Sequence, residues 1–441
     1  MADLRFSIDW LSSGSVDPVL RDTSAQLSIH LDEICLTRHE DVWSKTVRDA
    51  VLVSAYPLAL WFASSWWRLN WEPLPQKGAK PPLDWRMVHE MGAANHGFVW
   101  PRVLFASDGE MINIWAESIA TQGQSVGYLN GLNIPRSVSV DTFQSQVSGF
   151  IEDVLHRLDA VGCGQTDLAS LWSFVQEDRL SPDASNRRRL EAQMGFDPEE
   201  CPAEVMDDVL RIQEIMGVNA LSELAPIFGR CGGMTLVEID ALVKVKGIRG
   251  HPQVSQKTIN VNSSLTAPWQ QGVDAARQLR AELGNINEPI DENKLLDLLG
   301  LTKREVDSWG GQKNKSIAIA RPRSGGGFDF IPRKLHRFAR RFEFARFLEE
   351  CLNTFLSPQD WLITSDLATA KQKRQRAFAA EFLCPIQSLV SFLDGDYSEY
   401  SFENASEYFG VSGKTIESLL ANNGYLELQT IEPQMPYRLT T

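Results

Sequence analysis

The pattern of apolar and polar positions divides the chain into a mixed α+β first part and a mostly helical remainder. Partly alternating runs rich in apolar and β-branched residues predict strands over Phe6–Leu11, Gln26–Thr37 and Arg48–Ala55. An amphipathic helix is predicted from Pro57 to about Leu69. Asp108-Gly109 predicts a hairpin turn between strands Arg102–Ser107 and Glu110–Ala116, and a helix follows over Val140–Asp159, with Asp141 as its cap. We therefore expect residues 1–162 to form an α+β domain.

The next hundred residues carry apolar side chains at three- and four-residue spacing, which is typical of helices. Glycines punctuate these runs. The predicted helices are Leu168–Glu177, Pro202–Met216, Ala220–Phe228 and Leu236–Lys244. The polar stretch His251–Leu265 predicts a linker. Residues 163–262 are thus expected to be helical, with no strand of more than a few residues.

The last part, residues 263–441, mixes helices with a small sheet. Strands are predicted over Ser316–Ala320 and Gly327–Ile331, on either side of a glycine-rich turn. The helices expected here are Trp269–Leu283, Glu292–Leu299, a long basic helix from about Lys334, Ala368–Phe382 and a small final helical unit. The whole chain is therefore predicted to be α+β and multidomain.

Three ordered motifs in the last part resemble the ImmA/IrrE family of zinc metallopeptidases. Arg340-Arg-Phe-Glu-Phe-Ala-Arg-Phe-Leu-Glu-Glu is similar to the family's R-R-F-x-x-A-H-E-x-x-H. Ala377-Phe-Ala-Ala-Glu-Phe-Leu-Cys-Pro resembles its F-A-A-x-L-L-M-P run, and Ala405–Tyr425 its closing element, which is similar to a helix-turn-helix. The resemblance covers about 268–430 and implies that residues 263–441 have the fold of that peptidase.

The four positions that carry the family's chemistry are all changed in this chain. The resemblance places the two zinc-binding histidines at Arg346 and Glu350, the general base at Phe347, and the third ligand at Gln372. An arginine is not a zinc ligand, and a phenylalanine has no proton acceptor. The resemblance therefore implies the family's fold without its metal or its catalysis. Because Arg346 and Glu350 are four residues apart, we expect an interior ion pair to replace the metal; a repurposed ligand pocket is the alternative.

Two basic runs stand out in an otherwise acidic chain. They comprise Arg333, Lys334, Arg337, Arg340, Arg341, Lys371, Lys373 and Arg374. Pairing with acidic residues such as Glu349, Glu350 and Asp394–Asp396 is the favoured interpretation, and an anion or nucleic-acid patch is the alternative. The helix Gly413–Ala421 has one lysine and one glutamate, which is poor for phosphate contacts.

Composition and charge narrow the class of protein further. The chain has 441 residues, a net charge of −14, and six cysteines without a C-x-x-C pair, so neither a general polyanion binder nor a zinc ribbon is expected. His89 and His96, seven residues apart, are too far apart along a helix to share one zinc.

No apolar run is long enough to span a membrane and the start does not resemble a signal peptide, so a soluble cytoplasmic protein is expected. The tryptophans at 61, 66, 67 and 71 indicate a core helix.

Together these features predict a non-catalytic, ImmA/IrrE-like regulator, sensor or scaffold of a bacterial cell, active in stress response, mobile-element control or phage defence. No cofactor and no metal are expected. The expected partner is a protein, either a helix-turn-helix regulator or a second copy; nucleic acid is not favoured, and a membrane is not expected. Two alternatives stay open: an active metallopeptidase that uses other ligands, and a nucleic-acid-binding regulator that uses the basic helices.

Overall fold

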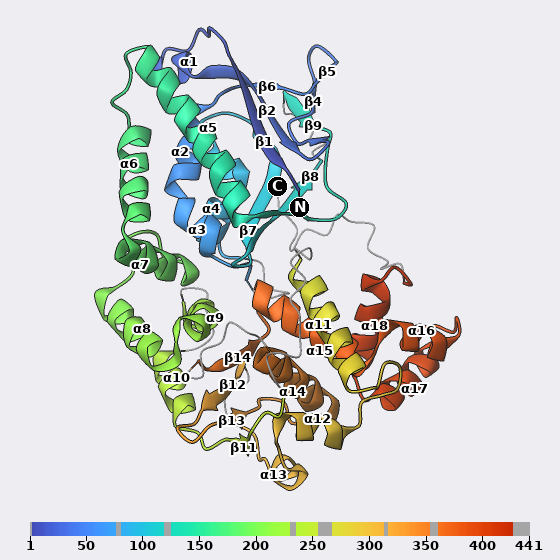
Figure 1. Ribbon diagram of the computed structural model, residues 1–441. Coiled ribbons are helices and arrows are strands. Elements are labelled where there is room, and N and C mark those ends of the chain that lie inside the picture. Colours follow the sequence, from blue (N-terminus) through green and yellow to red (C-terminus); the bar gives the residue numbers. More distant parts are fainter. Residues whose placement is uncertain are drawn as a thin grey trace. The chain divides into compact units, whose positions relative to one another are not determined.

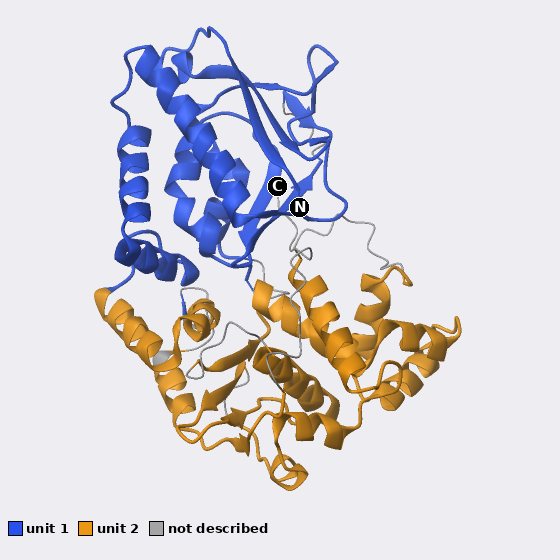
Figure 2. Ribbon diagram, in the orientation of Figure 1, with its two compact units in different colours: residues 1–202, 229–231, 430–441 blue, residues 203–228, 232–429 orange. Residues whose placement is uncertain are grey.

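A computed structural model describes residues 2–75, 81–118, 125–229, 235–254, 267–312, 316–352 and 360–426. The chain forms two compact units (Figure 2). Unit 1 comprises residues 1–202, 229–231 and 430–441, and unit 2 comprises residues 203–228 and 232–429. The expected middle region, 163–262, is divided between the units, because its first helices belong to unit 1 and the others to unit 2.

Unit 1 combines three small antiparallel sheets with helices (Figure 1). In the first sheet the central strand β2 pairs with β1, β3 and β6; the other two sheets have the orders β10-β8-β7 and β5-β4-β9. The strands are β1 (Leu4–Trp10), β2 (Ser24–Leu31), β3 (Ile34–Cys35), β4 (His39–Asp41), β5 (Thr46–Arg48), β6 (Val51–Ser54), β7 (Arg102–Ser107), β8 (Met111–Glu117), β9 (Val126–Tyr128) and β10 (Arg136–Ser139). The helices are α1 (Pro18–Asp22), α2 (Tyr56–Ser64), α3 (Trp66–Trp71), α4 (Leu83–His89), a 3₁₀ turn (Met91–Ala94), α5 (Val140–Ala160), α6 (Asp167–Leu180) and α7 (Pro182–Gln193).

The core of unit 1 lies where β1 meets α2 and α5. Phe62 of α2 contacts Phe6 of β1 edge-on at 5.7 Å and Phe150 of α5 at 6.1 Å between ring centroids. Trp61, Trp66 and Trp67 are buried in the same cluster, as the tryptophan spacing predicted. Edge-to-face aromatic pairs add to the free energy gained by burying this apolar area.

Three local predictions for unit 1 were wrong in detail. The run Gln26–Thr37 is not one strand, because Asp32 takes a left-handed conformation, with φ of 53°, and the chain folds back as the β2–β3 hairpin. The helix expected from Pro57 to Leu69 is interrupted at Ser65 and forms α2 and α3. The cap of α5 is Ser139 rather than Asp141, because its hydroxyl accepts a hydrogen bond from the amide of Thr142.

Unit 2 is mostly helical, with one antiparallel sheet of order β11-β13-β12-β14. The strands are β11 (Ile248–Gly250), β12 (Ile317–Pro322), β13 (Phe328–Ile331) and β14 (Leu362–Ser365). The helices are α8 (Ala203–Met216), α9 (Val218–Phe228), α10 (Leu236–Val243), α11 (Pro268–Glu282), α12 (Glu292–Leu299), α13 (Lys303–Asp307), α14 (Arg337–Leu352), α15 (Ala370–Leu383), α16 (Ile386–Leu393), α17 (Glu399–Phe409) and α18 (Gly413–Asn422). Both predicted strands and the predicted helices of this part are present, although most of the linker expected over 251–265 lies outside the described residues.

Helices α11, α14 and α15 pack together in the core of unit 2 (Figure 1). The contact between α11 and α15 is close because Gly272 lacks a side chain: a Cβ there would lie 2.3 Å from the carbonyl oxygen of Arg374.

The part of the chain that the structure describes contains no single helix long and apolar enough to cross a membrane. The pair α15 and α16 passes that test only when its two helices, bent by 48°, are taken together.

Candidate functional site

The positions that the family resemblance singles out lie together between α14 and α15. Residues Phe344 to Glu350 form a continuous buried stretch of α14, with Arg346 and Glu350 one turn apart. Thr369 caps α15 by accepting a hydrogen bond from the amide of Gln372. That cap starts the helix so that Gln372 and Gln375, three residues apart, share the face that meets α14.

Arg346 is fully buried and hydrogen-bonds only to uncharged oxygen atoms among the described residues. Its Nη2 donates to Oε1 of Gln372 and, at 2.6 Å, to the main-chain oxygen of Ser365. Its Nε donates to Oε1 of Gln375 at 3.2 Å. Burial, together with the positive charges of Arg376 and Arg333, lowers the pKa of Arg346 to about 9. The guanidinium therefore stays charged at neutral pH inside the protein.

Gln372 joins Arg346 to a carboxylate from a third helix. Its Oε1 accepts from Arg346 and, at 2.8 Å, from the amide of Ser365. Its Nε2 donates to Glu223 of α9 at 2.8 Å and to the main-chain oxygen of Ile363 at 3.2 Å. Glu223 also accepts a 2.9 Å hydrogen bond from the hydroxyl of Thr369. Both ends of the amide are thus fully used, as a buried amide requires.

The ion pair expected between Arg346 and Glu350 is not found among the described contacts, so that prediction was wrong. Glu350 instead lies 2.6 Å from Nζ of Lys371 and accepts a hydrogen bond from Nε2 of Gln375. The physical reason is that α15 supplies both a cation for Glu350 and amide oxygens for Arg346, so each side chain finds its partners across the helix interface, although Oε2 of Glu350 accepts no hydrogen bond there. Burial raises the pKa of Glu350 to about 7, although Lys371 opposes the shift.

Phe347, at the position of the family's general base, belongs to the hydrophobic core. Its side chain has no exposed area, and its ring meets that of Phe330 on β13 edge-on at 5.4 Å between centroids. No proton acceptor therefore stands at this position.

The residues present do not fit the zinc that the resemblance implies for relatives. A hydrolytic zinc needs about three protein ligands and an open position for water. Here Arg346 is a cation that would repel the metal, and the amide oxygen of Gln372 is already engaged by that cation. Across the described residues there is no group of three or more histidine, cysteine, aspartate or glutamate side chains arranged to hold a metal ion.

Most of the basic residues that formed the alternative anion patch are used inside the fold. Arg333 is buried between Glu343, at 2.8 Å, and Asp366, at 2.7 Å. The remaining pairings are Lys371 with Glu350, Arg374 with Glu349, Arg340 with Asp307, Arg337 with Glu292, and Arg341 with the main-chain oxygen of Ile290. The pairing with Glu349 and Glu350 agrees with the favoured interpretation. These contacts do not agree with a free cationic surface built from the same residues.

His89 in unit 1 is also committed to structure. Its Nδ1 lies 2.8 Å from the main-chain oxygen of Phe105 and its Nε2 lies 3.0 Å from Oε2 of Glu72. The same Glu72 accepts a 2.7 Å hydrogen bond from the buried Arg68. His89 stacks on Trp85 at 4.0 Å and has no exposed area. Both nitrogens are occupied, which leaves neither for a metal.

Sequence reasoning missed Glu223, Gln375 and Lys371 as members of the network around Arg346. Gln375 could have been found from its three-residue spacing to Gln372, since both then share one helix face. Glu223 carried no such signal, because it comes from a helix 146 residues before Thr369 in the sequence.

No protein-family description, no curated protein and no solved structure matches this chain.

Proposed function

We propose that this chain is a non-catalytic relative of ImmA/IrrE-like zinc metallopeptidases that acts by binding a protein partner. The proposal is carried by one observation, which is the hydrogen bond from Arg346 to Gln372. The resemblance assigns these two positions to two ligands of one zinc ion. They are in contact, as ligand positions must be, but the contact is made by a guanidinium and an amide.

The chemistry of the surrounding residues supports the absence of peptide hydrolysis. Hydrolysis at such a site needs a metal-bound water and a base that takes its proton. Phe347 offers no base, and the side chains of Arg346, Gln372 and Gln375 are hydrogen-bonded to one another. A buried hydrogen-bonded network of this kind holds α9, α14, α15 and β14 together, which is the structural role that a metal has elsewhere.

Loss of catalysis leaves binding as the function that the fold can still perform. Recognition of a protein needs a surface rather than zinc, so a regulator, sensor or scaffold in a bacterial stress, mobile-element or defence response remains the function we propose. This step is an analogy with the family that the sequence resembles. The network around Arg346 then keeps the fold of the binding protein intact.

The test uses the purified full chain. Elemental analysis should find no stoichiometric zinc, and digestion of unfolded casein should proceed no faster than in buffer, before and after treatment with a chelator. The Arg346→Met variant serves as the matched control. It should digest casein no more slowly than the wild type does, because an inactive site cannot lose activity. One zinc per chain, removed by the chelator together with a peptidase activity, would overturn the proposal in favour of an active enzyme with other ligands.

A further inference from the structure

The C-terminal helices α16, α17 and α18 form a small packed group (Figure 1), in which α16 has no charged residue, α17 has only acidic ones, and α18 has Lys414 and Glu417. Between residues 377 and 413 the sequence has six acidic residues and no lysine, arginine or histidine. Five of the six are exposed, namely Asp394, Asp396, Glu399, Glu403 and Glu407. Hydrogen bonds from Ser401 and Ser398 hold the pKa of Asp396 below its usual range, so this carboxylate stays charged.

Helix α17 presents these charges as a row. Glu399, Glu403 and Glu407 are four residues apart and therefore lie along one side of the helix. None of the three has an ion-pair partner among the described residues, and Glu407 lies in the last turn, where the helix dipole disfavours a negative charge. Like charges at this spacing destabilise an isolated helix. Glu399 lies in the first turn, where the dipole favours a carboxylate, so the cost of the row falls on Glu403 and Glu407.

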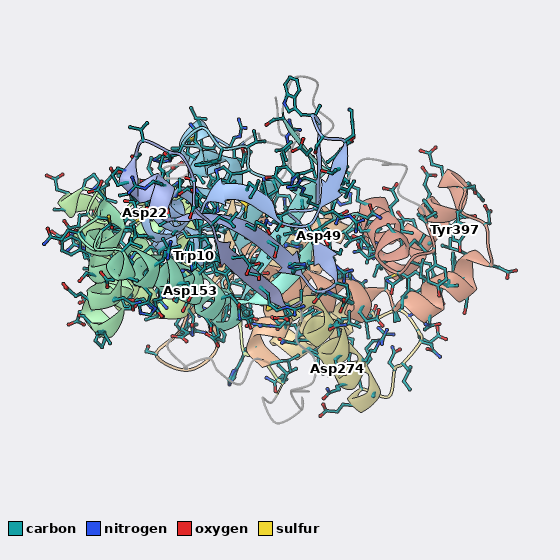
Figure 3. The ribbon with its side chains drawn as sticks, turned by 90° about the horizontal axis from the view of Figure 1, so that it is seen from above. Trp10, Asp22, Asp49, Asp153, Asp274 and Tyr397 are labelled. Carbon is teal, nitrogen blue, oxygen red and sulfur yellow. The ribbon has the colours of Figure 1, made fainter. Side chains whose placement is uncertain are left out.

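Exposed aromatic rings lie beside the carboxylate row. Tyr400 and Tyr408 are 72% and 48% exposed, and by helical periodicity they lie on the solvent-facing side of α17 next to the glutamates. Tyr408 stacks on Phe392 of α16, which is itself 40% exposed, at 4.7 Å between ring centroids. Tyr397, labelled in Figure 3, is exposed in the turn before α17.

This combination identifies the chemistry of a partner. Carboxylates attract lysine and arginine side chains, and tyrosine rings bind the same cations through their π faces, arginine in particular. The surface repels phosphate groups and therefore does not suit nucleic acid or an anionic membrane. The basic helices of a second copy suit it less, because Arg340, Lys371 and Arg374 on α14 and α15 already form ion pairs within the chain.

We infer that the exposed side of α17, with Phe392 and Tyr397 beside it, is a docking surface for an arginine- and lysine-bearing segment of a protein partner. This surface, the acidic–aromatic face, comprises Glu399, Glu403, Glu407, Tyr400, Tyr408, Phe392 and Tyr397. The inference deepens the proposed function by naming the surface and the chemistry of its partner, and it rests on that function only in requiring that the partner is bound and not cut.

The experiment measures binding of a fluorescent peptide of alternating arginine and alanine to the full chain by anisotropy, at low and at physiological salt. The variant Glu399→Gln/Glu403→Gln/Glu407→Gln should bind about tenfold more weakly at low salt, since it removes three exposed charges that attract the peptide. The matched control is Glu204→Gln/Asp207→Asn/Glu214→Gln, which removes three exposed charges from α8 and should bind as the wild type does. Tyr400→Ala/Tyr408→Ala should weaken binding of the arginine peptide more than of a lysine peptide.

Equal weakening by the α8 control would overturn the inference, because the peptide would then respond only to net charge. Failure of the wild type to bind the peptide would overturn it as well. A dimer in sedimentation that the α17 variant abolishes would also overturn the inference. So would binding of duplex DNA to the wild type that the α17 variant loses. The metal and casein measurements on the wild type are independent of all these outcomes, so the two proposals can fail separately.

Discussion

Arg346 of α14 donates a hydrogen bond to the side-chain oxygen of Gln372 of α15, and both side chains are buried. The contact joins two helices at the position to which the resemblance in the sequence assigns a zinc ion in the ImmA/IrrE peptidases. A charged group stabilises such an interface only when its hydrogen bonds are complete, because a buried and unpaired charge costs several kcal/mol. Arg346 approaches this condition through Nε and Nη2, which donate to three oxygen atoms from Gln372, Gln375 and Ser365.

Arg346→Met should destabilise unit 2 because it removes the hydrogen bonds to these three oxygen atoms, of which Oε1 of Gln372 still accepts one from the amide of Ser365. We expect a loss of about 3 kcal/mol in the free energy of unfolding, measured by urea denaturation with circular dichroism. Arg337→Met on the same helix is the control: its side chain is 62% exposed, and its ion pair with Glu292 is long, at 3.9 Å. A change of about 0.5 kcal/mol or less is expected there. Equal losses in the two variants would contradict this account of Arg346.

Glu350 should make the stability of the protein depend on pH. Its pKa is raised by burial from the usual 4.5 to about 7, so the folded state holds the proton more tightly than the unfolded state does. The stability from this group is therefore fully present below pH 4.5 and is lost as the pH rises through 7. Glu350→Gln should remove this decline, which urea denaturation at a series of pH values would show. Glu403→Gln, on the exposed side of α17, should leave the decline unchanged; an unaltered decline in Glu350→Gln would assign it to another group.

Gly272 sets the distance between α11 and α15. Gly272→Ala would place a methyl group against the backbone of Arg374, which cannot yield as a side chain can, and we expect a loss of about 2 kcal/mol. Gly149→Ala on α5 is the control, because no atom lies within 4 Å of its added Cβ. Alanine should stabilise that helix by up to about 1 kcal/mol. Thermal unfolding of both variants tests the pair, and stabilisation by Gly272→Ala would show that the helices can move apart freely.

His89 should be essential for the packing of unit 1. His89→Leu leaves the main-chain oxygen of Phe105 without its partner and removes one contact from Glu72, so a loss of about 2 kcal/mol is expected. His96→Asn is the matched control: His96 is exposed with φ of 56°, and asparagine tolerates that conformation. Urea denaturation followed by tryptophan fluorescence reports on this unit. If His89→Leu proves as stable as the wild type, the buried contacts of His89 contribute little.

Local patterns predicted the elements well wherever the signal lies within a few residues. The Asp108-Gly109 turn between β7 and β8 and the helix Glu292–Leu299 follow from neighbouring residues alone. The break at Ser65 and the turn at Asp32 were missed, because apolar spacing continues through both. Spacing along one helix also predicted the wrong partner for Arg346. Its true partners come from α15 and β14, and a choice between an acid four residues away and an amide on another helix depends on tertiary packing.

We propose that hydrogen bonds around Arg346 occupy the place that a metal has in the peptidases that the sequence resembles. The most direct test titrates Co²⁺, a spectroscopic substitute for Zn²⁺, into the wild type and into Arg346→His/Glu350→His/Gln372→Glu, with circular dichroism to verify that both are folded. We predict no tetrahedral absorption bands in the wild type and one bound equivalent in the variant, since three ligands then converge. Tetrahedral Co²⁺ bands in the wild type, or their absence in a folded variant, would contradict the claim.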